Sequence, residues 1–122
     1  MPRDFDFETV TYFFDSDGDN SVQTINGSDG RLFMLEISHI NAIQSWIQLF
    51  DTSGTITPGS TTPKFSFVIE KSDATEYKYR PIYFGPEGVL FKNSIKYACT
   101  TTPEGSTNPT AGLIINAVFA DL

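Results

Sequence analysis

Short runs of strand-forming residues, separated by turn signals about every 8 to 12 residues, limit the folds open to this chain more than any other feature. The runs are rich in β-branched and aromatic residues, which favours strands. Ile40, Ile43 and Ile47 also fit helical spacing, but the composition of their segment favours a strand. The runs are residues 5–14, 21–25, 31–40, 43–51, 64–70, 76–84, 89–93, 94–102 and 111–122. The sequence therefore predicts an all-β fold, a jelly-roll-like antiparallel β-sandwich of about eight strands.

The length of the chain, 122 residues, is that of one domain. We expect a single β-sandwich domain over residues 1–122, with an N-terminal arm at residues 1–12. In the run at residues 76–84, Pro81 predicts an edge strand or a bulge, because proline has no backbone N–H to donate.

The charge of the chain restricts its partners. The net charge is −7, from 15 acidic and 8 basic residues, and the basic residues are scattered. This argues against nucleic acid, because phosphate binding needs clustered Lys and Arg. No apolar run approaches the roughly 20 residues of a membrane span, and the first residues do not resemble a signal peptide. We expect no nucleic-acid and no membrane partner, and a soluble protein made in the cytoplasm.

Residues with catalytic chemistry are few. Cys99 is the only cysteine, which excludes an intrachain disulfide and a thiolate zinc cluster. His39, the only histidine, shares its strand face with Leu35 and Ile37, which predicts a core or rim histidine with a backbone partner. Phe33 is predicted on that same face. No nucleophile, metalloprotease or phosphate-binding motif is present. We therefore predict no enzyme activity, no cofactor, and no catalytic, cofactor-binding or metal residues.

Three aspartates, Asp15, Asp17 and Asp19, suggest either a calcium loop or a hairpin turn. A calcium loop that starts at Asp15 needs glycine at its sixth position and glutamate at its twelfth. Asn20 and Asn26 stand there, so the pattern fails twice.

The hairpin interpretation is therefore preferred. It places Asp17-Gly18 at the apex of a two-residue turn, so that Asp15 faces Asn20 and Phe13 faces Val22 in the next strand. Whether the aspartates bind an adventitious cation stays open.

Four aromatic residues form a second candidate site. Tyr77, Tyr79 and Tyr83, together with Trp46, could stack against a sugar. The alternative is that tyrosine on a half-exposed strand is simply good strand material.

The last run is apolar on both of its faces, although a sandwich strand normally has one face in water. This predicts either a central strand with loops or the N-terminal arm packed over its outer side, or a neighbouring subunit that covers that side. Asn116 is then expected to hydrogen bond in a partly buried position. The two sets are Leu113, Ile115, Ala117 and Phe119, and Ile114, Val118, Ala120 and Leu122.

Two Thr- and Pro-rich loops, residues 57–63 and 102–109, resemble each other. Ordinary loop composition is one explanation. If the similarity is real, the loops lie at one end of the sandwich and form a joint contact surface.

From Trp46 onward the sequence resembles small bacteriophage virion structural proteins. The resemblance covers roughly residues 46–122 and implies no catalytic residues. The residues that carry it are Leu49-Phe50-Asp51, Thr62-Pro63, Gly88 to Phe91 with Lys92, Ala98 to Thr102, and Gly112 to Phe119.

This resemblance implies a capsid decoration or cement protein. Such a protein is a compact β-sandwich, often a trimer, which binds the major capsid protein across subunit junctions and stabilises the head of the virion. The candidate contacts are the arm, the two loops and the last strand. The alternative function is a carbohydrate- or receptor-binding module of a phage tail or fibre, with the tyrosine-rich strand as its site.

Overall fold

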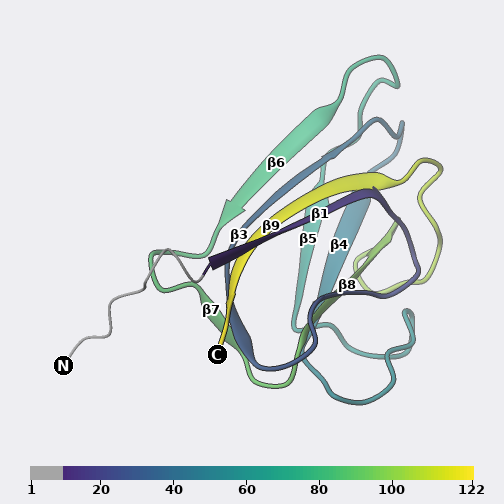
Figure 1. The fold of residues 1–122 in the computed structure, drawn as a ribbon. Helices are drawn as coiled ribbons and strands as arrows, with labels where there is room; N and C mark the ends of the chain where they lie inside the picture. The colour runs from purple at the N-terminus through teal and green to yellow at the C-terminus, as the bar shows by residue number, and fades with distance from the viewer. Residues whose placement is uncertain (1–9) are drawn as a thin grey trace.

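The structure, a computed structural model, describes residues 10–122, which form nine strands in two antiparallel sheets (Figure 1). None of the described residues belongs to a helix that could cross a membrane. Residues 1–9 of the expected arm lie outside the description, and residues 10–12 begin the first strand. The strands are β1 (Val10–Gly18), β2 (Gln23–Asn26), β3 (Gly30–His39), β4 (Ser45–Phe50), β5 (Phe65–Ile69), β6 (Lys78–Tyr83), β7 (Val89–Phe91), β8 (Ile95–Thr100) and β9 (Leu113–Asp121).

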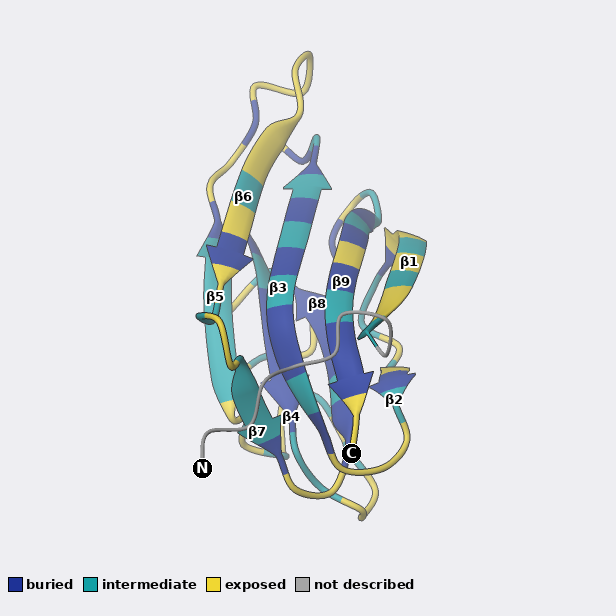
Figure 2. Ribbon diagram, turned by 60° about the vertical axis from the view of Figure 1, so that its left-hand side comes forward, coloured by how far each residue is buried: buried dark blue, intermediate teal, exposed yellow. Residues whose placement is uncertain are grey.

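The two sheets have the strand order of a jelly roll. Sheet A runs β1-β9-β3-β6, with the short strand β7 also paired to β3, and sheet B runs β2-β8-β4-β5. Without β7, this is an eight-stranded double-sheet arrangement in which the last strand returns beside the first. The predicted all-β sandwich and its jelly-roll character are confirmed. Figure 2 shows the two sheets as facing layers.

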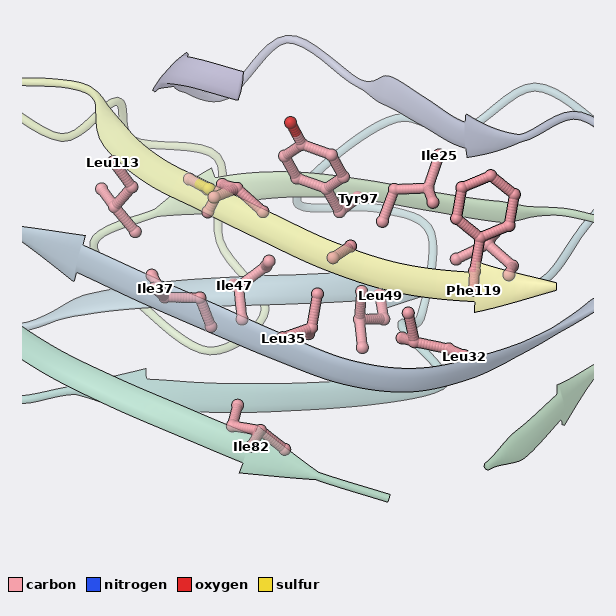
Figure 3. Packing of buried hydrophobic residues seen from close by; sticks show 14 of the residues in the cluster. Ile25, Leu32, Leu35, Ile37, Ile47, Leu49, Ile82, Tyr97, Leu113 and Phe119 are labelled. Atoms are coloured by element: carbon pink, nitrogen blue, oxygen red, sulfur yellow. The ribbon is translucent and has the colours of Figure 1, made fainter. Parts of the chain in front are cut away.

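The inner faces of the two sheets form the core. Leu35 and Ile37 of β3 pack in one cluster with Ile47 and Leu49 of β4, and all four are completely buried (Figure 3). Alternate residues of each strand supply this cluster, as the period of two in a strand requires. Removal of this apolar surface from water is the main force that holds the sheets together.

The connections between successive strands mostly cross from one sheet to the other. The predicted hairpin at Asp17-Gly18 is therefore wrong: β1 pairs with β9, and β2 pairs with β8. Phe13 lies opposite Ala117 instead of Val22. The expected turn at Asp15–Gly18 is instead the end of β1, which continues through these residues with a shift in register, and turn residues do not specify which strand the chain pairs with next.

A bulge in β3 changes which residues face the core. The register with β9 shifts between Leu32 and Met34, so Leu32 and Leu35 both point inward although they are three residues apart. Phe33 is buried but lies outside the core cluster, which corrects its predicted place beside Leu35 and Ile37.

Gly88 accommodates the bulge. It has a φ of +68°, and an added Cβ would lie 2.7 Å from the carbonyl oxygen of Leu32 and 2.9 Å from the ring of Phe33. A glycine is therefore required there both by its backbone conformation and by the close approach of β3.

Two predictions about strand position are confirmed. Pro81 lies in β6, the edge strand of sheet A, opposite Glu36. β9 is a central strand, between β1 and β3. Asn116, however, is exposed on the outer face of β9, and not partly buried as predicted.

Candidate functional site

The outer face of sheet A carries a row of apolar side chains that crosses four strands. The pairing places Tyr12 of β1 opposite Val118 of β9, and Val118 opposite Met34 of β3. Met34 in turn lies opposite Tyr83 of β6. Residues that are paired in this way share a face of the sheet. The row is therefore continuous from one edge of the sheet to the other.

The two ends of this row, and Phe14 beside Tyr12 on the same face of β1, are open to water. Tyr12 is 76%, Phe14 63% and Tyr83 69% exposed, while Met34 and Val118 are half-buried between them. A groove of about 290 Å³ lies along the row, and its lining is almost entirely apolar. We define the sheet A patch as the outward residues of the row and its neighbours on β1: Val10, Tyr12, Phe14, Met34, Tyr83 and Val118. Figure 2 shows exposed positions along β1 and β6.

The outer face of sheet B is covered by the chain's own loops. Phe50, Gln48 and Thr100 point away from the core, yet each is at most 1% exposed. Gln48 Nε2 donates to the carbonyl of Gly105 at 3.0 Å and to Thr100 Oγ1 at 2.8 Å, which holds the second Thr-Pro loop against the sheet. Gln48 Oε1 has no partner among the described residues.

The two Thr-Pro loops meet over this face. A Cβ added to Gly59 of the first loop would lie 3.3 Å from the Cβ of Ser106 in the second. The loops begin at opposite ends of the paired strands β4 and β8, because these strands are antiparallel. The expectation of a joint surface at one end of the sandwich is therefore corrected: the loops meet by folding back over sheet B.

His39 is a core residue, and both of its ring nitrogens are hydrogen bonded. Its Nε2–H donates to the carbonyl of Glu70 at 2.7 Å, and its Nδ1 accepts from the backbone N–H of Asn41 at 3.1 Å. Ser45 Oγ lies 3.3 Å from the same Nδ1. Both His39 and Ser45 are completely buried, so this Ser-His pair has no access to a substrate. The prediction of a core histidine with a backbone partner is confirmed.

The aspartate-rich stretch closes one edge of the sandwich. Asp15 lies on the inward side of β1 and accepts a hydrogen bond from the Tyr97 hydroxyl of sheet B. Burial and this carboxylate raise the pKa of Tyr97 far above its usual value. A register shift between Asp15 and Gly18 marks a bulge, which explains how polar turn residues continue a strand. Sequence reasoning missed this bridge because Asp15 and Tyr97 are 82 positions apart.

The remaining polar groups of this stretch also have structural partners. The carbonyl of Asp19 accepts from the backbone N–H of Cys99 at 2.7 Å, and Asn20 donates to the carbonyl of Ser106. Burial raises the pKa of the Cys99 thiol, which keeps it protonated at neutral pH. Among residues 10–122, no three His, Cys, Asp or Glu side chains are placed to hold a metal ion.

The predicted sugar platform is not assembled. Tyr79 and Tyr83 share the outer face of sheet A, and the Tyr79 hydroxyl donates to Glu36 at 3.0 Å. Trp46 lies in β4 of sheet B, opposite Thr100 and Val68. Tyr77 precedes β6. The tryptophan is therefore separated from the tyrosines by the thickness of the sandwich.

No protein-family model and no curated protein matches this chain. Among solved structures, it is similar to the Tobacco streak virus coat protein, with a TM-score of 0.45, 10% identity, and coverage of 93% of this chain and 87% of that one. A structure of the dimer of that coat protein gives a TM-score of 0.41, 10% identity, and coverage of 93% and 86%. The VLP of the giant freshwater prawn Macrobrachium rosenbergii extra small virus gives a TM-score of 0.36 and 11% identity. The match covers 90% of this chain and 75% of that one.

Proposed function

We propose that this chain is a non-enzymatic structural protein of a virion, a capsid decoration protein formed by one sandwich domain. It binds the major capsid protein across junctions between capsid subunits and stabilises the head. It acts there as a homo-oligomer, for which the sequence resemblance favours a trimer. No cofactor, nucleic acid or membrane takes part.

The observation that carries this proposal is the apolar outer face of sheet A, which none of residues 10–122 covers. An exposed contiguous apolar patch on a folded domain marks a surface for another macromolecule. The groups that a catalyst would need, His39, Ser45 and Cys99, are completely buried and serve the packing of the sheets. The molecule therefore offers its surroundings a contact surface and no reactive side chain from this set.

The charge of the chain suits the same role. Among the described residues, the charges behind the net charge of −7 lie almost entirely outside the outer face of sheet A, so the other surfaces of the molecule favour contact with basic patches on a partner. Charge complementarity of this kind mainly increases the association rate and the specificity. Binding should therefore weaken as salt is added, because exposed charges are screened over about 10 Å at 0.1 M salt.

The test is cosedimentation of the purified protein with empty shells of the virus that encodes it, prepared without this protein. We expect saturable binding at a fixed number of copies per shell, slower association at high salt, and a higher temperature for shell disruption. Shells of an unrelated virus are the control. Binding to glycans in place of shells, lost in Tyr79→Ala and Tyr83→Ala, would contradict the proposal in favour of the carbohydrate-binding alternative.

A further inference from the structure

We propose that a second copy of this chain occupies the sheet A patch, so that two sandwiches pack through the outer faces of their A sheets about a two-fold axis. This inference deepens the proposed function and rests on it in one respect, that the chain is a contact protein. The partner is identified by the chemistry of the patch, which fits an identical acidic chain better than an oppositely charged one.

The distribution of charge selects the partner. Among the paired outward positions of sheet A, only Glu36 and Arg31 are charged, although the chain carries 15 acidic residues. Glu36 accepts from the Tyr79 hydroxyl, and Arg31 donates to the backbone carbonyl of Glu87 at 3.3 Å. A basic partner would find almost no charge to pair with on this face. Two copies with a net charge of −7 can meet here, because their acidic groups remain elsewhere.

The patch combines exposed rings with a groove of half-buried residues. The rings of Tyr12 and Tyr83 stand at the two ends of the row, and the shorter, half-buried Val118 and Met34 lie between them. The groove along the row is thus flanked by exposed tyrosines. In a two-fold interface the same patch supplies both the protruding group and its pocket. A tyrosine of one copy can therefore enter the groove of the other, and the reverse contact follows by symmetry.

The composition of the patch agrees with an interface centre. Tyrosine, phenylalanine and methionine are enriched in the buried centres of protein interfaces, and charged residues are depleted there. The hydroxyl groups of Tyr12 and Tyr83 can keep hydrogen bonds at the rim while their rings are buried. The expected unit is a pair, which differs from the trimer that the sequence resemblance favours.

The test measures the mass of the full-length protein by sedimentation velocity over a range of concentrations, without shells. We expect a dimer that dissociates on dilution. Tyr12→Glu and Tyr83→Glu should each raise the dissociation constant by about 30-fold or more, the effect of losing an aromatic ring buried in the partner's groove. Tyr77→Glu is the matched control, because Tyr77 is also a tyrosine, 57% exposed, and lies outside the patch. Its dissociation constant should not change.

Thermal unfolding of each variant first establishes that it is folded. A wild-type trimer, or a wild-type monomer at all concentrations, would overturn the inference. An equal increase of the dissociation constant in Tyr77→Glu would also overturn the inference. If the wild type is a monomer and the double variant Phe5→Ser, Phe7→Ser associates, the occupant is the N-terminal arm of the same chain, and the inference is wrong.

These outcomes are independent of the virion role. Failure of the pair leaves shell binding intact in the cosedimentation experiment, whereas failure of the proposed function leaves a dimer that does not bind shells.

Discussion

The two outer faces of the sandwich are built from the same kind of strand, but loops cover the outer face of sheet B and no described loop covers that of sheet A. On sheet B, Phe50 is 1% exposed beside the loop after β4, and Gln48 is buried where it donates to Gly105 of the loop after β8. On sheet A, Phe14 is 63% exposed, and no described loop lies over the row between Tyr12 and Tyr83. Among the described residues, outward apolar side chains are therefore buried on sheet B and exposed on sheet A.

The difference follows from the lengths of the connections. Residues 51–64 separate β4 from β5, and residues 101–112 separate β8 from β9, so both segments can return across sheet B. The connections from β6 to β7 and from β7 to β8 cover only residues 84–88 and 92–94, and they cannot cross a four-strand face. The apolar content of a strand thus indicates burial, while the neighbouring loops decide whether the chain itself supplies it.

The largest expected effect compares one phenylalanine from each face. Phe50→Ala should lower the free energy of unfolding by about 3–5 kcal/mol, because it leaves a cavity beneath the covering loop. Phe14→Ala should change it by about 0.5 kcal/mol or less, because an exposed ring loses little on truncation. Urea denaturation below the concentration at which the protein associates measures both. Similar losses would show that the two faces are equally covered.

The second prediction concerns Gly88, which supports the bulge under the sheet A groove. Gly88→Ala should lower the free energy of unfolding by about 1–3 kcal/mol. Residue 88 has a left-handed backbone conformation, and the added Cβ would also clash with the Leu32 carbonyl. Gly85→Ala is the matched control, with a φ of +98° and no atom within 4 Å of the added Cβ. Gly85→Ala therefore measures the effect of the left-handed backbone conformation alone, a loss of about 1 kcal/mol in the free energy of unfolding. Equal losses in the two variants would show that the contact with β3 does not matter.

The third prediction concerns the attachment of the cover on sheet B. Gln48→Leu should lower the free energy of unfolding by about 1 kcal/mol, because the Gly105 carbonyl loses its donor, while removal of the unpaired Oε1 offsets part of that cost. Hydrogen exchange should increase in residues 101–108 and not in sheet A. Ser66→Ala, which removes a hydrogen bond to the Pro103 carbonyl at 2.7 Å, should have a smaller effect. Unchanged hydrogen exchange in residues 101–108 would show that Gln48 does not hold this loop against sheet B.

The sequence predicted the strands well because their signals are local. Alternation, turn residues and Pro81 gave the strand positions, the central place of β9 and the edge position of β6. Pairing between strands depends on residues far apart in the chain, so the Asp17-Gly18 hairpin was predicted between neighbours that the fold places in different sheets. The bulge at Phe33 was missed because its cause, the close approach of Gly88, is also distant in sequence.

The candidate site was predictable only in part. The doubly apolar last strand led to the correct question of what covers its outer side, and Val118 belongs to the sheet A patch. The other members come from β1, β3 and β6, and their alignment is a property of the register. Trp46 was grouped with the tyrosines by residue type alone, and the topology separates them.

The smallest expected effect is on the pH dependence of stability, at the base of the first covering loop. Asp51 accepts backbone N–H groups of Lys92 at 2.9 Å and Asn93 at 2.7 Å, and its carboxylate lies 3.7 Å from Lys64 Nζ. Burial raises the pKa of Asp51, but the hydrogen bonds from Lys92, Asn93 and Ser94 outweigh it and lower the pKa below its usual value.

A carboxyl group with a lowered pKa in the folded state stabilises the protein above its unfolded pKa of about 4, and this contribution is lost as the pH falls through the folded value. Stability should therefore decline below about pH 4, and Asp51→Asn should make the decline shallower. Asp73→Asn is the comparison: hydrogen bonds from Thr75 and Glu76 also lower the pKa of Asp73, so this variant should flatten the acid limb as well, but less, because these partners lie in one solvent-exposed turn. A larger effect of Asp51→Asn on the acid limb is the expected result, because the Asp51 carboxylate joins the base of the first covering loop to residues 92–94. An equal effect of the two variants would contradict this account of the Asp51 contacts.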